Sequence, residues 1–173
     1  EEGVCIERYL DDKIKDIEAG SGGLILQPFW TPGITNPNAS GAIIGFSDFH
    51  TRYHLYRAII EGICLELYHG LVKMQKRSSV TVDELYAGGG GSSSPVVCQI
   101  AADVFGLPVH RIQTHEASAV GCAMVAFISP RVYGSYEDAI EHMVHKKDVF
   151  IPNEENHRTY MKIYGKAYSH LAS

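Results

Sequence analysis

Leu85-Tyr-Ala-Gly-Gly-Gly-Gly-Ser-Ser-Ser-Pro-Val-Val-Cys-Gln-Ile-Ala-Ala-Asp-Val-Phe-Gly-Leu-Pro108 is the stretch that decides the fold of this chain. Residues 85–87 are a short apolar run that predicts a strand, and the four glycines and three serines that follow predict a loop. Pro95 is typical of the first residue of a helix, where its missing amide and fixed φ cost nothing. Gly106 and Pro108 mark the end of that helix. The stretch therefore predicts a strand, a loop and a helix in succession.

A glycine-rich loop before a helix has a chemical use. Glycines let the backbone approach a ligand closely, and a helix N-terminus presents unpaired N–H groups with partial positive charge, so phosphate is the natural ligand. The loop lacks the Gly-Lys-Ser/Thr ending of a P-loop, and serines replace the last glycine of a dinucleotide fingerprint. By itself such a loop is more often a tight connection than a nucleotide site. Other motifs must decide between these interpretations.

Composition limits the class of protein. The 173 residues fit one domain, residues 1–173, and 45% hydrophobic with 20% charged residues is ordinary for a soluble protein. The net charge of -5 argues against a nucleic-acid partner. The four cysteines are far apart and are expected to be reduced and structural. Without a signal peptide or a long apolar run, a cytoplasmic location and no membrane partner are expected.

The remaining pattern predicts alternating strands and helices. Helices are expected at 4–17, 53–74, 95–105 and 118–126 and after the capping residues Ser135 and Asn153, and strands at 24–30, 41–46, 85–87 and 109–112. The inward face of the longest helix is predicted to carry Leu55, Ile59, Ile63, Leu67, Leu71 and Met74. This order favours an α/β sheet layered with helices, with ligands at the carboxyl ends of the strands.

Two glycines inside predicted helices suggest close packing. Gly62 costs up to about 1 kcal/mol relative to alanine, so we expect it to lie against another backbone. The helix at 118–126 is so rich in small residues that Gly121 is also expected to lie close to a neighbour. The pairs His50/His54 and His142/His145 have metal-like spacing, but they lack further ligands, so no metal site is predicted.

Three segments in this order resemble the C-terminal domain of the FGGY carbohydrate kinase family, which includes xylulose kinase and glycerol kinase. The first joins Gly41–Phe46 to His54–Gly62 and is similar to the second signature of the family. The second, Gly89–Val109, is similar to the nucleotide loop and its helix. The third, Glu116–Ala123, resembles the small-residue helix near the end of these kinases.

The resemblance implies an actin-like, ribonuclease H-like ATPase fold. In these kinases two such domains close around ATP and a sugar or polyol, and a substrate hydroxyl attacks the γ-phosphate while Mg²⁺ bridges phosphate oxygens. It also implies that Gly89, Gly90 and Gly91 cradle the phosphates and that Ser94 occupies the place of a nucleotide-contacting asparagine. The full set expected to bind the nucleotide is Gly3, Glu7, Gly89, Gly90, Gly91, Ser92 and Ser94.

The resemblance also implies that parts of the kinase lie outside this sequence. The chain enters at Glu1-Glu2-Gly3 without a methionine, so we expect a piece of a longer protein that is inactive alone. The catalytic aspartate, the sugar-binding domain and the first strands are expected upstream, so no catalytic residue is assigned here. An open sheet edge favours self-association. Residues 23–30 look more like xylulose kinases than glycerol kinases, which favours a xylulose-like ketose as substrate.

Two other interpretations compete with the kinase. A non-enzymatic actin-like module could keep the fold and its nucleotide affinity without transferring phosphate, and a full-length gene without a catalytic aspartate would favour it. A dinucleotide-binding oxidoreductase is disfavoured, because the acidic residue expected about 20 positions beyond the loop does not end a clear strand. Glu116 lies at roughly that distance but opens a helix.

Overall fold

The computed structural model describes residues 6–30 and 37–171 and shows a mixed α/β fold. The helices are α1 (Ile6–Ile14), α2 (Arg52–Ser78), α3 (Pro95–Phe105), α4 (Ala117–Ile128), α5 (Tyr136–Met143), α6 (Glu154–Ile163) and α7 (Ser169–Leu171). Short helical turns are η1 (Ser21–Gly23), η2 (Gly90–Ser93) and the π-helical η3 (Tyr164–Tyr168). The strands are β1 (Ile25–Gln27), β2 (Ala42–Ile44), β3 (Leu85–Ala87), β4 (Val109–Ile112) and β5 (Lys146–Phe150).

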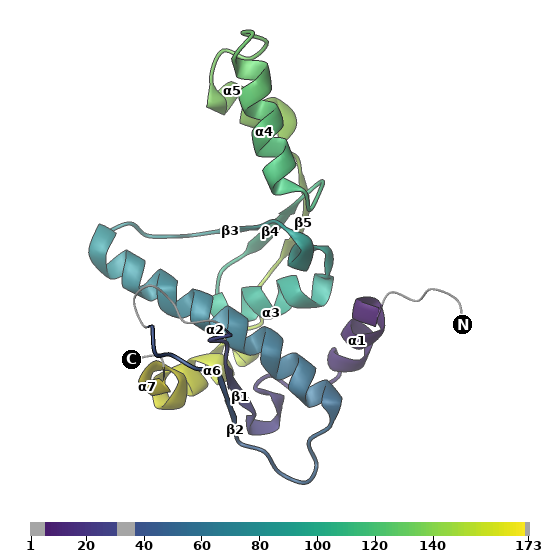
Figure 1. Ribbon diagram of the computed structural model, residues 1–173, viewed down its shortest axis with the longest axis vertical. Helices are drawn as coiled ribbons and strands as arrows, with labels where there is room; N and C mark the ends of the chain where they lie inside the picture. Colours follow the sequence, from purple (N-terminus) through teal and green to yellow (C-terminus); the bar gives the residue numbers. More distant parts are fainter. Residues whose placement is uncertain (1–5, 31–36, 172–173) are drawn as a thin grey trace.

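The strands form two small sheets. β1 and β2 pair antiparallel, while the second sheet has the order β3-β4-β5. β3 and β4 run parallel and are joined through α3, as a parallel pair requires, because only a long crossover returns the chain to the same end. Figure 1 shows α2 running past α3, with α4 and α5 projecting beyond the sheet. The glycine-rich loop therefore follows the carboxyl end of β3, as the sequence predicts.

The strand β5 was not expected from the sequence, which places only helices after β4. It pairs antiparallel with β4 at the edge of the sheet. Its charged residues Lys146, Lys147 and Asp148 interrupt any apolar alternation, so the usual strand signal is weak. Charges of this kind are common on edge strands, where they discourage pairing with other chains.

The long helix α2 buries a different face from the one predicted. Ile63, Leu67 and Met74, all expected to point inward, are 40%, 61% and 50% exposed. The buried side instead carries Arg57, Ala58, Ile60, Glu61, Gly62, Cys64, Leu65 and His69. This face packs against α1, β1 and α3. The buried face of α2 contains an ion pair and small residues. A prediction based on the spacing of large apolar residues therefore chose the wrong face of the helix.

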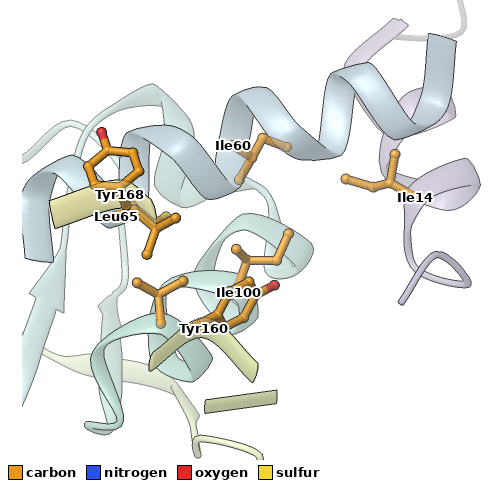
Figure 2. Close-up of a cluster of buried hydrophobic side chains, with 8 residues drawn as sticks. Ile14, Ile60, Leu65, Ile100, Tyr160 and Tyr168 are labelled. Carbon is orange, nitrogen blue, oxygen red and sulfur yellow. The ribbon is translucent and has the colours of Figure 1, made fainter. Parts of the chain in front are cut away.

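One hydrophobic cluster joins α1, α2, α3 and the C-terminal helices. Its buried members are Ile14, Ile60, Cys64, Leu65, Ile100, Val104, Tyr160 and Tyr168 (Figure 2). Ile14 holds α1 to this cluster, whereas Ile6, two turns nearer the start of the helix, is 61% exposed. The cluster therefore fixes only the C-terminal end of α1 against α2.

A buried polar network reinforces the same junction. Arg57 donates from Nε to Glu61 Oε1 at 2.7 Å and from Nη1 to the carbonyl oxygen of Ile14 at 2.9 Å. Tyr160 donates its hydroxyl to Glu61 Oε1 at 2.8 Å, and Ser21 donates to Glu61 Oε2 at 2.8 Å. Burial and the nearby Glu61 carboxylate raise the pKa of Tyr160, so its proton stays in place to donate. The network connects α1, η1, α2 and α6.

The small-residue helix α4 does not approach a neighbour as predicted. A Cβ added to Gly121 would meet no atom of the described chain within 4 Å, and Val125 and Phe127 are 54% and 44% exposed. The main neighbour of α4 is α5, and the two project together from the fold (Figure 1). The expectation that Gly121 is a packing glycine is therefore wrong for the residues that the structure describes.

The histidine pairs have structural roles. His54 completes a capping box with Thr51 at the start of α2, and His50 accepts from the backbone amide of Ser47 at 2.9 Å. Within residues 6–30 and 37–171, no three His, Cys, Asp or Glu side chains are close enough to hold one metal ion.

Cys64 and Cys98 are buried, but Cys122 on α4 is exposed. No helix in the described ranges has the length and apolar character needed to cross a membrane.

Gly62 is confirmed as a packing glycine, and we expect Gly62→Ala to destabilise the protein. Its Cβ would overlap the carbonyl oxygen of Leu26 and lie 2.9 Å from Leu26 Cδ2. Overpacking costs about 1–3 kcal/mol, which exceeds the gain of at most about 1 kcal/mol in helix propensity. Gly70→Ala on the same helix meets open space, so it should raise stability. Equal denaturation midpoints for the two variants would contradict this packing.

Candidate functional site: a nucleotide pocket

The glycine-rich loop folds into a compact turn held by its own serines. Gly89 has a φ of +82°, a conformation that favours glycine, and its amide donates to the carbonyl oxygen of His115 at 2.8 Å. Ser92 and Ser93 donate their hydroxyls to the carbonyl oxygens of Gly89 and Gly90, both at 2.7 Å. The hydroxyls thus fold the loop back on itself. These internal hydrogen bonds give the turn its shape.

Ser94 and Pro95 begin α3 directly after this turn. The Ser94 hydroxyl accepts from the amide of Val97 at 3.1 Å, which makes it the N-cap. The remaining amides of the first helical turn have no partner within the helix, and the helix dipole adds partial positive charge. An anion such as phosphate is stabilised at this end of an α-helix. The side chain of Ser94 therefore orders the turn that the sequence predicts to meet the nucleotide.

Two of the loop glycines present bare backbone. A Cβ added to Gly90 or Gly91 would meet no atom of the described chain within 4 Å. Packing within this chain therefore does not require glycine at either position. The backbone does not require it either, since neither Gly90 nor Gly91 has a positive φ. A ligand that lies against the backbone supplies such a reason, because a side chain would occupy its place. The loop therefore fits a phosphate-bearing cofactor.

A pocket of about 670 Å³ joins this turn to α1. It is lined by Glu7, Arg8, Asp11, Asp12, Ser93, Ser94, Pro95, Val96, Arg111 and Lys147. Two predicted residues far apart in sequence, Glu7 and Ser94, thus line the same hollow. A second hollow of about 560 Å³ shares Pro95 and Val96 and continues between α3 and the segment after α1. The first turn of α3 separates the two.

The other predicted residues lie around this pocket or outside the described ranges. Gly89, Gly90 and Gly91 lie in the turn that leads to Ser93, next to the pocket but not among the residues that line it. Ser92 is only 4% exposed, so it supports the turn from beneath. Gly3 lies outside the residues that the structure describes.

Asp11 is the unusual acidic group of the pocket. It is only 8% exposed, and its Oδ1 has no hydrogen-bond partner in the described chain. A buried carboxylate oxygen without a partner is costly, and such groups are often satisfied by a ligand or by water. Asp11 lines the pocket together with Glu7 and Asp12, so α1 presents three carboxylates on this side.

Asp103, by contrast, is a structural carboxylate. It is 2% exposed and accepts from the side-chain amides of Gln99 and Asn156 and from the backbone amide of Asn153, each at 2.8 Å. Every one of these donors belongs to α3 or to the start of α6. The carboxylate therefore ties these helices together and is not available to a substrate.

Arg111 lines the pocket, although no pattern in the sequence pointed to it. It lies on β4 opposite Asp148 of β5, and its Nε donates to Asp148 Oδ2 at 2.8 Å. Its Nη1 reaches the carbonyl oxygens of Ser92 and Ser93, both at 3.2 Å. The pair depends on β5, which the sequence pattern did not reveal. Asp11 was also missed, since one aspartate on an amphipathic helix usually faces solvent.

Comparison with known proteins identifies the family. The family model of the C-terminal domain of FGGY carbohydrate kinases matches residues 20–129. The xylulose kinase of Staphylococcus epidermidis is 31% identical over 149 residues, which are 84% of this chain and 30% of that protein. Among solved structures, the xylulose kinase of Rhodospirillum rubrum has a TM-score of 0.81 at 29% identity and covers 96% of this chain and 33% of that one.

A more distant structure shares the fold alone. The glycerol kinase of Plasmodium falciparum, solved with ADP, has a TM-score of 0.77 at 18% identity and covers 95% of this chain and 33% of that one. The chain thus spans about a third of the length of the relatives that it matches. The expected actin-like ATPase fold is confirmed by these neighbours. The chain therefore belongs to the FGGY family of carbohydrate kinases and carries the C-terminal domain of that family.

Proposed function

We propose that residues 1–173 are the nucleotide-binding domain of a kinase that transfers the γ-phosphate of ATP to a carbohydrate hydroxyl. The observation that carries this proposal is one pocket that Glu7 of α1 lines together with Ser93 and Ser94 at the start of α3. The first turn of α3 suits the phosphates of a nucleotide, and the acidic face of α1 suits its uncharged adenosine. Membership of a carbohydrate kinase family supports ATP as that nucleotide.

Each part of the site has a proposed role. The backbone of Gly89, Gly90 and Gly91 lies against the phosphates, while Ser92 and Ser94 hold the turn and the first turn of α3 in shape. Glu7, together with Gly3 from the undescribed N-terminal residues, lies at the adenosine side. Phosphoryl transfer depends chiefly on positioning and on stabilising charge, which this arrangement supplies.

Mg²⁺ belongs to the proposal as the partner of ATP. It would offset the negative charge of the phosphates during transfer. The chain's own residues bind and orient the nucleotide around it. We assign no catalytic base within this chain, because the family resemblance places the catalytic aspartate upstream, and Asp103 is held by three hydrogen bonds to neighbouring helices. The proposed activity is therefore that of the whole protein, in which another region supplies the base and the sugar site.

The proposed acceptor is a xylulose-like ketose. Support comes from residues 23–30 and from relatives named xylulose kinase at 31% and 29% identity. Relatives named glycerol kinase also match, as does one named L-xylulose/3-keto-L-gulonate kinase, so the acceptor needs a direct test. The residues that select the sugar are proposed to lie mainly outside this chain.

The proposal predicts that the full-length protein releases ADP from ATP and Mg²⁺ when a suitable ketose is present. A coupled ADP assay with D-xylulose, L-xylulose, gluconate and glycerol would rank the acceptors, and the phosphorylated product would be identified by mass spectrometry. We expect the highest kcat/KM with a xylulose. A glycerol preference would overturn only the acceptor. ADP binding without transfer to any carbohydrate would favour a non-enzymatic nucleotide-binding module.

A further inference from the structure

Arg111 on β4 contacts the glycine-rich turn from outside it. Its Nη1 donates to the carbonyl oxygens of Ser92 and Ser93, both at 3.2 Å. Its Nε and Nη2 both donate to Asp148 Oδ2. One guanidinium thus connects two consecutive loop carbonyls to one carboxylate. Because the five donors of arginine form a rigid plane, fixing one side of the group fixes the other.

The neighbouring strand β5 fixes the position of the Arg111 guanidinium. Arg111 and Asp148 are direct cross-strand partners in the antiparallel pair of β4 and β5. The Arg111 side chain is only 15% exposed, and its guanidinium carbon lies 5.6 Å from the centre of the Phe150 ring. Cross-strand pairs of opposite charge and cation–aromatic contacts both favour one side-chain position. The carboxylate therefore keeps Arg111 directed at the turn.

The contacts have an electrostatic consequence for the pocket. Carbonyl oxygens carry partial negative charge, so a turn that presented them to a phosphate would repel it. Arg111 binds the carbonyl oxygens of Ser92 and Ser93 and neutralises their partial charge, although it also lines the pocket with Ser93 and Ser94. The amides of Gly89, Ser92 and Ser94 donate to carbonyl oxygens, so an anion at the turn would meet the other amides of the turn.

We propose that Arg111, held by Asp148, is a positioning residue that orients the turn 89–94 for the phosphates of the nucleotide. This inference rests on the proposed function of the same pocket. It assigns to β4 and β5 a role in nucleotide affinity, although neither strand contributes to the glycine-rich loop. The Arg111 guanidinium acts through the loop carbonyls and does not itself bind the phosphates.

The test compares ADP with adenosine by calorimetric titration of the full-length protein in the presence of Mg²⁺. Arg111→Met removes the donors and keeps most of the volume. Loss of charge-assisted hydrogen bonds predicts a Kd for ADP that rises about tenfold or more, whereas the Kd for adenosine, which has no phosphates, stays within about twofold. Asp148→Asn should also weaken ADP binding, because it releases Arg111 from its position.

A matched control lies on the same sheet. Glu84 pairs with His110 of β4 and Lys146 of β5 at 2.9 and 3.3 Å but does not contact the turn. Glu84→Gln should therefore leave the affinities for ADP and adenosine unchanged. If Arg111→Met does not fold, Arg111→Lys serves instead, because it keeps the charge but cannot reach both carbonyls and Asp148.

The outcomes separate this inference from the function on which it rests. If the wild-type protein binds no ADP, the nucleotide pocket itself is wrong. If the wild type binds ADP and the Arg111 variants bind it equally well, only the positioning role is overturned. If Asp148→Asn tightens ADP binding, the released guanidinium contacts the phosphates directly, and the positioning role is again overturned. Parallel losses for ADP and adenosine would indicate general damage to the pocket and contradict the inference as well.

Discussion

Gly90→Val is expected to abolish measurable binding of ADP by the full-length protein while leaving its fold intact. A Cβ added at this position would meet no atom of the described chain within 4 Å, and Gly90 does not have a positive φ, so we expect the fold to accommodate a valine. The same side chain would occupy the space in which a phosphate lies against the loop backbone. Close backbone approach is the property that glycine supplies and that every other residue removes. We expect a rise in the Kd for ADP of about 100-fold or more, equivalent to about 2.7 kcal/mol or more.

Gly70→Val provides the matched control for this loop substitution. Gly70 lies on α2, outside the glycine-rich turn, and an added Cβ there also meets no described atom within 4 Å. Its replacement should change neither the fold nor the affinity for ADP. Circular dichroism and thermal unfolding would establish that both variants fold. If folded Gly90→Val bound ADP as tightly as the wild type, the assignment of the phosphates to this loop would be wrong.

Glu61→Ala is expected to cause the largest loss of stability of any change discussed. Glu61 is 3% exposed and accepts from Arg57, Tyr160 and Ser21, as well as from the backbone amide of Gly20 at 3.1 Å. Its removal leaves the Arg57 charge buried without its carboxylate. Breaking a buried pair in this way typically costs about 3–5 kcal/mol. Denaturant unfolding of the wild-type and variant proteins would measure this loss.

Two further variants make the measurement specific. Glu61→Gln keeps the shape and one acceptor oxygen, so it should cost less than Glu61→Ala. Lys15→Met breaks the exposed ion pair with Asp12, which lies at 3.0 Å, and should leave the unfolding midpoint nearly unchanged. A loss for Glu61→Ala no larger than that for Lys15→Met would contradict the buried network.

The part of the fold that local chemistry specifies was predicted from the sequence. The strand at 85–87, the start of α3 at Pro95 and its end at Gly106 lie where the sequence places them. Ser135 and Asn153 cap α5 and α6 as predicted. Each of these features depends on one or two residues whose backbone preference acts locally. Such signals can be read without knowledge of the tertiary fold.

The features that depend on tertiary contacts were not predicted. The buried face of α2 contains Arg57 and Glu61, which are tolerated inside only because they pair with each other and with Tyr160. The strand β5 carries charges and gains its structure from pairing with β4. Arg111 could be recognised as a site residue only from the structure, because its position depends on the pairing of β4 with β5. Long-range partners of this kind leave no periodic signal in a single sequence.

The candidate site shows the same division. The glycines 89–91 and Ser94 were predicted from the loop and the family resemblance, and the structure places Glu7 beside Ser94 at one pocket. Asp11 is buried there with one unpartnered oxygen, which no spacing rule indicates. Its burial follows from the way in which Ile14 and the Arg57 network hold α1 against the core. The loop residues of the site can therefore be predicted from local motifs, whereas the residues of α1 join the site through tertiary packing.

Calorimetric titration of ADP with Mg²⁺ into the full-length wild-type protein tests the central claim most directly, and the 173-residue chain would be titrated in parallel. We expect saturable binding of one ADP per full-length chain, and competition by ATP at the same site. Binding to the 173-residue chain as well would show that the pocket between α1 and α3 is complete within it. If neither protein binds ADP or ATP, the pocket is not a nucleotide site, and the proposed kinase function of this domain would be contradicted.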